Sequence, residues 1–463
     1  MGVTTQLARF AAAVALPALP PEVVGRARLL ALDLVGNIVR ARHEAESSQA
    51  LLGAVRALGL GAGHACVFGD PCRWTPAGAA LLNGAFGHSL DFDDTHAAGS
   101  LHPGTTVIPA ALAAGEMAGA TGAEVLAGIV AGYEVACRVA LALPARSHYE
   151  RGFHPTATCG VFGAATAAGL VLGLDAAGIE SALGIGLSQA AGSMQFLANG
   201  AWTKRFHGGW AALAGLAAAT LAAEGFRGAE AALEGQHGFL RAYAADAAPE
   251  RAVQGLGNDF ELMRTAVKPY PCCRYSHAGI DAALALRAAH KLGAEEIESV
   301  TYGLSPAGML LVGEPAARKA DPTSVVDAQI SGPFVIACAL ATGIMEWDSY
   351  RLLHDPAIRR LLAKVQCQHD PDMAGLGPMA GRLTVVTRGG TFSRVVAVPI
   401  GEPETFPTAD DLRAKFDALA TPVLGPERTA RLADAVLAMD GVGDISRLMR
   451  LGVPLMAARL AGE

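Results

Sequence analysis

The sequence has few charged residues for its length. Only 17% of its 463 residues are Asp, Glu, Lys or Arg, and aromatic residues make up 6%. The net charge is −7, and no basic block or basic–aromatic stripe occurs, which argues against nucleic acid as a partner. This low charge, combined with 52% hydrophobic residues, predicts an extensive core and a buried subunit interface.

Local motifs for metals and membranes are also missing. The eight cysteines never show C-x-x-C spacing, so a zinc ribbon or a local iron–sulfur motif is unsupported. Scattered thiols in a long chain are typical of reduced, intracellular proteins, so we expect a cytoplasmic location. We see no signal peptide, and the uncharged run 155–174 is too weakly hydrophobic to predict a membrane span. We expect neither a metal nor an organic cofactor.

Titratable residues are concentrated in one stretch, residues 84–104, between apolar segments. Burial of such groups without partners costs several kcal/mol, whereas in a cleft they are the usual source of shifted pKa values and acid–base chemistry. Singly, each of them suits a helix cap or a satisfied core position, but together they predict a site. The stretch contains His88, Asp91, Asp93, Asp94, Thr95, His96 and His102.

Two later stretches supply further candidates. His154 precedes Pro155 and an apolar helix, and the positive end of a helix dipole disfavours a protonated imidazole there. Lys204, Arg205 and His207 bring three potential cations into one turn of an acidic protein. A capping or core histidine in the first case, and a solvated loop in the second, are the alternatives that these patterns leave open.

Hydrophobic periodicity predicts a mainly α fold. Helical spacing covers 22–39, and nearly all-apolar helices are predicted at 106–119, 122–142, 160–173 and 176–190. Strand-like alternation is confined to 297–304, 381–387 and 392–399, of which the last two are typical of a hairpin; helices are predicted at 278–291, 324–342 and 355–364. We therefore predict a discontinuous all-helical domain, residues 1–264 and 403–463, with a smaller α+β lid domain at 265–402.

The ordered motifs of the chain resemble those of the MmgE/PrpD family, which includes 2-methylcitrate dehydratase, cis-aconitate decarboxylase and iminodisuccinate epimerase. The resemblance extends over essentially the whole chain and implies a helical domain, an α+β lid and homodimerisation through the helical part. The matching segments are residues 83–96, 102–104, 152–156, 204–209, 268–277 and 324–331.

The resemblance also implies a site for a di- or tricarboxylate, without metal. The catalytic positions are Asp91, His102, His154, Lys204 and Lys268, and the candidate substrate-binding positions are Thr95, Arg205, Cys273, Arg274 and His277. Decarboxylase members have a histidine where this chain has Cys273 and a tyrosine where it has Leu311. Both differences weaken a cis-aconitate decarboxylase interpretation.

These residue types suit proton transfer next to a carboxylate. Two histidines can act as acid and base, in either assignment, with Asp91 tuning one of them, while lysines stabilise the charge that develops on the carboxylate. We expect dehydration of a 2-methylcitrate-like hydroxy acid, with epimerisation of a substituted succinate such as iminodisuccinate as the alternative and cis-aconitate-type decarboxylation after it.

Three other classes of function fit parts of the sequence. The D-x-D-x-T pattern at 91–95 also occurs in aspartyl phosphotransferases, but it should follow a strand, and residues 79–87 predict a helix. The same His and Asp side chains could chelate a divalent metal in a helical bundle. A non-enzymatic scaffold would have no use for so many titratable groups between apolar helices.

Overall fold

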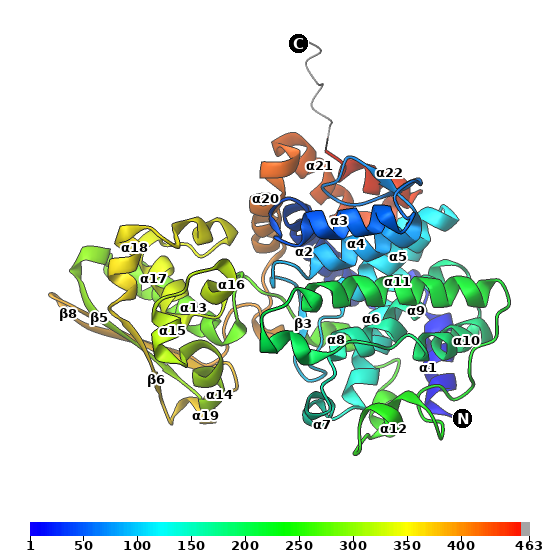
Figure 1. Ribbon diagram of the computed structural model, residues 1–463, viewed down its shortest axis with the longest axis horizontal. Coiled ribbons are helices and arrows are strands. Elements are labelled where there is room, and N and C mark those ends of the chain that lie inside the picture. Colours follow the sequence, from blue (N-terminus) through cyan, green and yellow to red (C-terminus); the bar gives the residue numbers. More distant parts are fainter. Residues whose placement is uncertain (455–463) are drawn as a thin grey trace, which may run out of the picture. The chain divides into compact units, whose positions relative to one another are not determined.

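The computed structural model describes residues 1–454 and divides into two compact units, shown in Figure 1. The first unit is Met1–Val267 together with Thr408–Glu463, and the second is Lys268–Pro407. The chain is 60% helical and 8% strand, so the predicted mainly α fold with a smaller α+β part is confirmed. The domain boundaries predicted at 264/265 and 402/403 lie a few residues before those of the compact units.

The first unit is built from helices and two short antiparallel strand pairs, β1–β2 and β3–β4. Within it, α9 packs against α5, α6 and α11, and α11 also packs against α4. Its elements are α1 (Val3–Ala13), α2 (Pro21–Glu44), α3 (Ser48–Ala57), β1 (Ala65–Cys66), β2 (Arg73–Trp74), α4 (Pro76–Gly87), β3 (Thr95–His96), α5 (Gly104–Ala118), α6 (Gly122–Leu141), α7 (Ala145–Glu150), α8 (Pro155–Thr158), α9 (Gly160–Val171), α10 (Ala176–Leu187), α11 (Thr203–Ala223), α12 (Phe239–Tyr243), β4 (Thr265–Ala266), α20 (Ala409–Leu424), α21 (Pro426–Leu437) and α22 (Ile445–Leu451).

Small residues let these helices approach closely. A Cβ atom at Gly163 of α9 would lie 2.6 Å from the carbonyl oxygen of Gly132 on α6, so only glycine fits at this crossing. Helix α11 is long and apolar enough to cross a membrane by length and composition alone, but 61% of its apolar window is buried inside the unit. A core position therefore explains its composition.

The second unit contains a four-stranded sheet in the order β6-β5-β7-β8. Strand β5 pairs in parallel with β6 and antiparallel with β7, and β7 and β8 form the predicted hairpin. Helix α13 packs against β7 and β8. The elements are α13 (His277–His290), β5 (Ile297–Leu304), α14 (Pro306–Gly308), α15 (Ala316–Ala320), α16 (Val325–Gln329), α17 (Gly332–Thr342), α18 (Pro356–Leu362), β6 (Val365–His369), α19 (Met373–Leu376), β7 (Gly381–Thr387) and β8 (Gly390–Val396).

One predicted helix of this unit is two helices. The prediction of a continuous helix over 324–342 is wrong because the chain breaks between α16 and α17. Ser331 caps α17 by accepting a hydrogen bond from the backbone N–H of Phe334, and Pro333 occupies its first turn. A proline there starts a helix readily but cannot donate to a preceding turn, so it marks a new beginning.

The C-terminal segment completes the first unit. Helix α20 packs against α2, and Lys415 Nζ lies 2.6 Å from Asp33 Oδ1 and 2.9 Å from the carbonyl oxygen of Phe92. The Lys415 side chain is 8% exposed and that of Asp33 is fully buried. This ion pair therefore joins residues near both ends of the chain to the loop that follows α4.

We predict that Lys415→Met lowers the free energy of unfolding by about 3–5 kcal/mol, because it leaves the Asp33 carboxylate buried without its cation. Chemical denaturation monitored by circular dichroism measures this change. Arg146→Met is the control, since Arg146 pairs with Glu150 on the surface of α7 and should give no measurable change. Equal stabilities of the two variants would contradict the prediction.

Candidate functional site

The loop between α4 and α5 is fixed at its centre by Asp94. Tyr133 of α6 donates a hydrogen bond from its hydroxyl to Asp94 Oδ2 at 2.7 Å, and the Gly104 N–H donates to Oδ1 at 3.1 Å. Burial raises the pKa of Asp94 to about 8, although the Tyr133 hydrogen bond opposes this shift. Asn37 of α2 donates to the Phe92 carbonyl, so helices on several sides hold this loop.

His102 is oriented by two acceptors. Its Nδ1 lies 2.8 Å from the Asp94 carbonyl oxygen and 3.3 Å from Asp93 Oδ2. Because neither acceptor can donate a proton, Nδ1 must carry the hydrogen and the neutral ring leaves Nε2 with a free lone pair. Burial lowers the pKa of His102 to about 4, despite the opposing effect of Asp93. A neutral imidazole with a bare Nε2 has the form of a general base.

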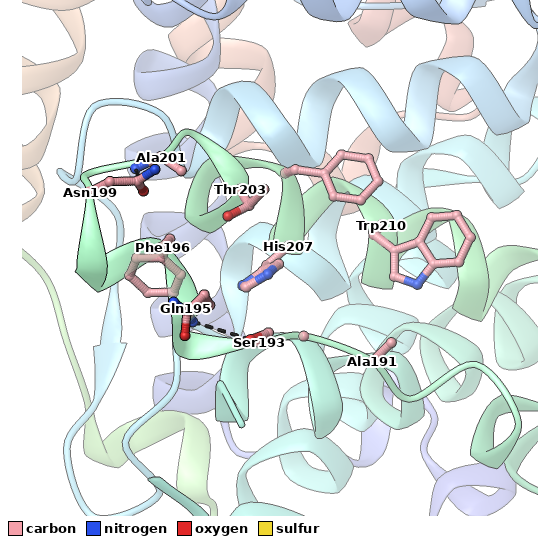
Figure 2. A pocket seen from close by; sticks show the side chains of 11 residues that line it. Ala191, Ser193, Gln195, Phe196, Asn199, Ala201, Thr203, His207 and Trp210 are labelled. Carbon is pink, nitrogen blue, oxygen red and sulfur yellow. Dashed lines mark hydrogen bonds between the residues drawn. The ribbon is translucent and has the colours of Figure 1, made fainter. Parts of the chain in front are cut away.

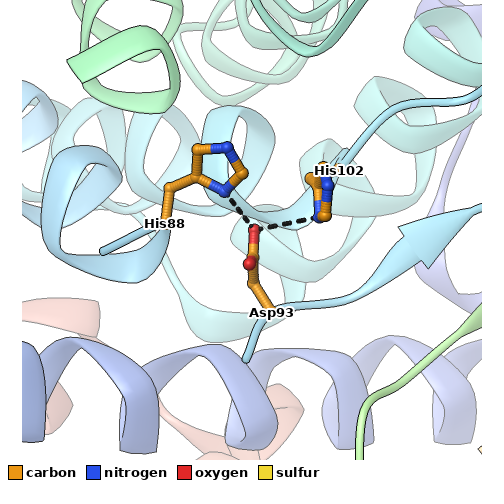
Figure 3. A group of neighbouring side chains, drawn as sticks. All are labelled: His88, Asp93 and His102. Atoms are coloured by element: carbon orange, nitrogen blue, oxygen red, sulfur yellow. Dashed lines mark hydrogen bonds and ion pairs between the residues drawn. The ribbon is translucent and has the colours of Figure 1, made fainter. Parts of the chain in front are cut away.

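Asp93 connects two histidines (Figure 3). His88 Nδ1 lies 2.7 Å from the same Oδ2 that faces His102. Burial alone would raise the pKa of Asp93, yet the two imidazoles hold it well below its ordinary value. Among residues 1–454, neither His88 Nε2 nor Asp93 Oδ1 has a hydrogen-bond partner. His102 keeps 14% of its side-chain surface exposed, whereas His88 and Asp93 are fully buried, so a ligand reaches His102 first.

The same three side chains could hold a metal ion. Their ligand atoms all lie within 4.8 Å of one another. Ligands on a tetrahedral zinc lie roughly 3.3 Å apart, since Zn–N and Zn–O bonds are about 2.0–2.2 Å. The 2.7 Å separation of His88 Nδ1 and Asp93 Oδ2 fits a hydrogen bond better than an edge of such a tetrahedron.

His154 forms a second imidazole pair. It lies before α8, and its Nδ1 is 3.0 Å from Nδ1 of His207 on α11, while its ring stacks 6.0 Å from that of His88. Burial, together with His88 and His207, lowers the pKa of His154 well below its ordinary value. The sequence predicted a neutral His154 because of a helix dipole. Burial is instead the main cause, because α8 has only four residues and its dipole is short.

A basic residue faces the loop from the start of α11. Lys204 Nζ lies 2.8 Å from Asp91 Oδ1, and their side chains are 31% and 27% exposed. Asp91 has φ of 53°, a left-handed conformation that Asp tolerates better than most residues. Arg205, the next residue, lies 3.7 Å from Glu46. Lys204, at 31% exposure, is thus the more open of the two cations, since the Arg205 side chain is 15% exposed.

Two further residues of the stretch have different surroundings. The Thr95 hydroxyl is buried and has no hydrogen-bond partner in the described part of the chain, which leaves it available to a ligand. His96 accepts a hydrogen bond from the Gly99 N–H at Nδ1 and places Nε2 3.0 Å from Glu261. Both ring nitrogens of His96 are therefore used in holding the loop.

The remaining predicted site residues belong to the second unit, which begins at Lys268. Arg274 pairs with Glu402, and the Cys273 N–H donates to the Gln329 carbonyl oxygen. His277 Nε2 lies 3.4 Å from the Cys272 carbonyl oxygen. Their participation in a site with His102 and His154 stays a prediction, as does that of Lys268.

His207 also lines a cavity of about 550 Å³ (Figure 2). Among residues 1–454, His207 is the only titratable side chain in its wall. The other lining residues are Ala191, Gly192, Ser193, Gln195, Phe196, Asn199, Ala201, Thr203, Phe206 and Trp210. Sequence reasoning noted His207 only as a potential cation, and it did not select His88 or Asp93 for the site. The signal for all three was present, because they lie within the two stretches already chosen.

Comparison with known proteins identifies the family. Residues 5–252 match the MmgE/PrpD N-terminal domain, and residues 270–440 match the MmgE/PrpD C-terminal domain. The chain belongs to the MmgE/PrpD family of enzymes. It is 28% identical to a cis-aconitate decarboxylase-like protein of Aspergillus oryzae, with 97% of each chain covered. It is also 28% identical to a cis-aconitate decarboxylase of Aspergillus terreus (97% and 96% covered) and 29% identical to the human enzyme of that name (83% and 81% covered).

Gly104 offers a test of how the loop in this MmgE/PrpD protein is held. A Cβ atom there would lie 2.6 Å from the Tyr133 hydroxyl and 2.8 Å from Asp94 Oδ1. We predict that Gly104→Ala lowers the free energy of unfolding by about 1–3 kcal/mol through overpacking.

The matched control is Gly25→Ala in α2, where nothing lies within 4 Å of the added atom and a stabilisation of about 0.5–1 kcal/mol is expected. Thermal and chemical denaturation of both variants measure the difference. A Gly104→Ala protein as stable as Gly25→Ala would show that Tyr133 and Asp94 do not constrain the loop.

Proposed function

We propose that this protein transfers protons beside a carboxylate group of a di- or tricarboxylate, and that it dehydrates a 2-methylcitrate-like hydroxy acid. The observation that supports this proposal is the set of contacts made by His102 Nδ1. Its Nδ1 proton is held by Asp93 and the Asp94 carbonyl, so Nε2 is free to accept a proton. Dehydration requires such a base for the carbon acid and an acid for the departing hydroxyl.

The two histidines take different roles in this scheme. His102 removes the proton, and the imidazolium that forms is stabilised by Asp93 at 3.3 Å. His154 in its protonated form donates a proton to the leaving hydroxyl and returns to the neutral imidazole, because its Nδ1 faces an imidazole and not a carboxylate that would retain the positive charge. The lowered pKa of His102 keeps this base neutral at pH 7, and the lowered pKa of His154 makes its protonated form a strong acid.

Lysines bind the carboxylates of the substrate. Lys204 is paired with Asp91 but remains partly exposed, so a substrate carboxylate can share its ammonium group. Lys268 is the second proposed carboxylate partner, with Thr95, Arg205, Cys273, Arg274 and His277 as further contacts. Positive groups placed against the carboxylate stabilise the charge that builds on it as the proton leaves, most strongly when water is excluded.

Decarboxylation of cis-aconitate is the second candidate reaction. Two relatives that cover 97% of the chain are named as a cis-aconitate decarboxylase-like protein and a cis-aconitate decarboxylase. Their names are a specific observation in favour of this reaction. Cys273 and Leu311 stand where decarboxylase members of the family resembled above have histidine and tyrosine, which favours dehydration. We further propose a cytoplasmic homodimer without metal or organic cofactor, for which the low charge content and the eight free thiols are the support.

Incubation of the purified enzyme with candidate substrates in heavy water tests the reaction. Separate samples contain 2-methylcitrate, iminodisuccinate and cis-aconitate, and NMR follows the products. Loss of water with formation of a new alkene from 2-methylcitrate is the expected result. Deuterium uptake with inverted configuration and no alkene would instead establish epimerisation, and carbon dioxide release from cis-aconitate would establish decarboxylation.

The lowered pKa of His102 predicts how kcat/KM depends on pH. As pH falls, protonation of His102 removes the base, so kcat/KM should decline through an apparent pKa near 4 rather than near 6.5. His102→Ala should lower kcat on the order of 10²–10⁴-fold. The control is His290→Ala, an exposed histidine at the end of α13, which should leave kcat unchanged. An acid limb that is identical in wild type and His102→Ala would remove His102 from this role.

A further inference from the structure

Lys319 of α15 is a buried cation that the function proposed above does not use. It is 5% exposed, and its Nζ donates a hydrogen bond to the Leu311 carbonyl oxygen at 2.8 Å. Among residues 1–454, no carboxylate forms an ion pair with it. An ammonium group has three N–H donors, so two of them remain uncommitted in the described part of the chain. A buried ammonium group in this state is unfavourable unless an anion joins it.

The groups that act electrostatically on Lys319 do not replace this anion. Asp327 is held by Arg318, whose Nη2 lies 2.8 Å from Asp327 Oδ1, and it also accepts a hydrogen bond from Ser324. Cys367 is a neutral thiol, because burial raises its pKa to about 12. Burial lowers the pKa of Lys319 itself, which is the expected response of an ammonium group in need of an anion.

Lys319 lies close to Cys273, a residue that is already proposed to contact substrate. The Cys273 N–H donates to the Gln329 carbonyl oxygen at 2.9 Å. Two residues later, Ser331 Oγ donates to the Lys319 carbonyl oxygen at 2.5 Å. The short segment between α16 and α17 therefore holds both residues, and the Cys273 thiol is among the groups that act on the Lys319 ammonium group.

The turn that Lys319 contacts lies at the surface of the second unit. This turn, Met309–Gly313, is a π-helix that follows α14 and packs against α15 and against residues 274–276. Single π-helical turns are frequently found at functional sites. Leu311 is 46% exposed and Cys273 is half-buried. The ammonium group of Lys319 is therefore bound to a turn that solvent reaches.

We propose that Lys319 is a substrate-binding residue of the second unit and that it takes one carboxylate group of a tricarboxylate. The inference rests on the function proposed above and extends it. A molecule such as 2-methylcitrate has three carboxylates, and Lys204 and Lys268 are the proposed partners of two of them. Lys319 supplies a third ammonium group, and the bound carboxylate supplies its anion. Arg274, another cation of this unit, is already paired with Glu402.

Binding of propane-1,2,3-tricarboxylate tests the proposal without turnover, because this molecule has no hydroxyl group to lose. Isothermal titration calorimetry measures its Kd for the full-length wild type and for Lys319→Met. We expect the variant to lose affinity on the order of 10–100-fold, since one charge-assisted contact is removed. The melting temperature without ligand should not fall, because replacement of a buried charge by an apolar side chain of similar size is often neutral or stabilising.

Lys364→Met is the matched control. Lys364 also donates to a carbonyl oxygen of the second unit, that of Ile297 at 2.6 Å, but it is half-buried. This variant should bind the tricarboxylate as tightly as the wild type. Lys319→Gln is the second test variant, since it keeps a donor for the Leu311 carbonyl oxygen and removes the charge. It should lose affinity by the same factor as Lys319→Met.

Three results would overturn the proposal. The first is wild-type affinity in a folded Lys319→Met or Lys319→Gln protein. The second is a lower melting temperature with unchanged affinity, which is the behaviour of a purely structural lysine. The third is absence of tricarboxylate binding to the wild type. Circular dichroism establishes that each variant is folded.

The binding measurement also separates this inference from the proposed reaction. Absence of turnover with 2-methylcitrate would refute the proposed dehydration, whereas the affinities of the wild type and Lys319→Met would still decide the role of Lys319. Turnover of 2-methylcitrate by the wild type, together with an unchanged Kd in Lys319→Met, would refute the role of Lys319 and leave the proposed reaction intact.

Discussion

The site depends on two adjacent carboxyl groups, those of Asp93 and Asp94, being buried inside an apolar helical unit. Burial of such groups is tolerated only when each has well-placed donors. Asp94 receives hydrogen bonds from the Tyr133 hydroxyl and the Gly104 N–H, and Asp93 receives them from two imidazoles. The hydrogen bonds that satisfy these carboxyl groups are therefore also the ones that orient His88 and His102. Folding of the loop and preparation of the base cannot be separated.

Residues outside the loop also help to hold this arrangement in place. Glycine at positions such as Gly132 and Gly163 lets α6 and α9 approach closely, so Tyr133 on α6 is held firmly where Asp94 needs its hydroxyl. Lys415 then brings α20 to the Phe92 carbonyl and to Asp33. Helix α20 thus stabilises a loop that is 323 residues away in sequence, counted from Phe92 to Lys415, and joins the two segments of the discontinuous helical unit.

Much of the fold could be predicted from the sequence, because long apolar helices and a β-hairpin have strong periodicity. The break before Gly332 was missed since Ser331 and Pro333 sit within an apolar run and their capping role depends on local geometry. Strand β6 was missed because its sequence, Val-Gln-Cys-Gln-His, has little hydrophobic alternation. For the site, the stretch and its titratable groups were found, but periodicity says nothing about which imidazole meets which carboxylate. Pairs such as His154 and His207 are 53 residues apart and become visible only in three dimensions.

The two proposed catalytic histidines differ in what binds their Nδ1 atoms, and this difference decides what each can do. Both are neutral because burial opposes a charge on the ring. His102 has a carboxylate at Nδ1, so once Nε2 accepts a proton the resulting imidazolium gains an ion pair. His154 has an imidazole at Nδ1, and its other close neighbours are His88, Lys204 and His102, so a positive charge there meets only neutral or positive groups. A proton is therefore favoured on His102 and disfavoured as a charge on His154. His102 is thus the ring suited to accept a proton, and a protonated His154 is the ring suited to give its proton away.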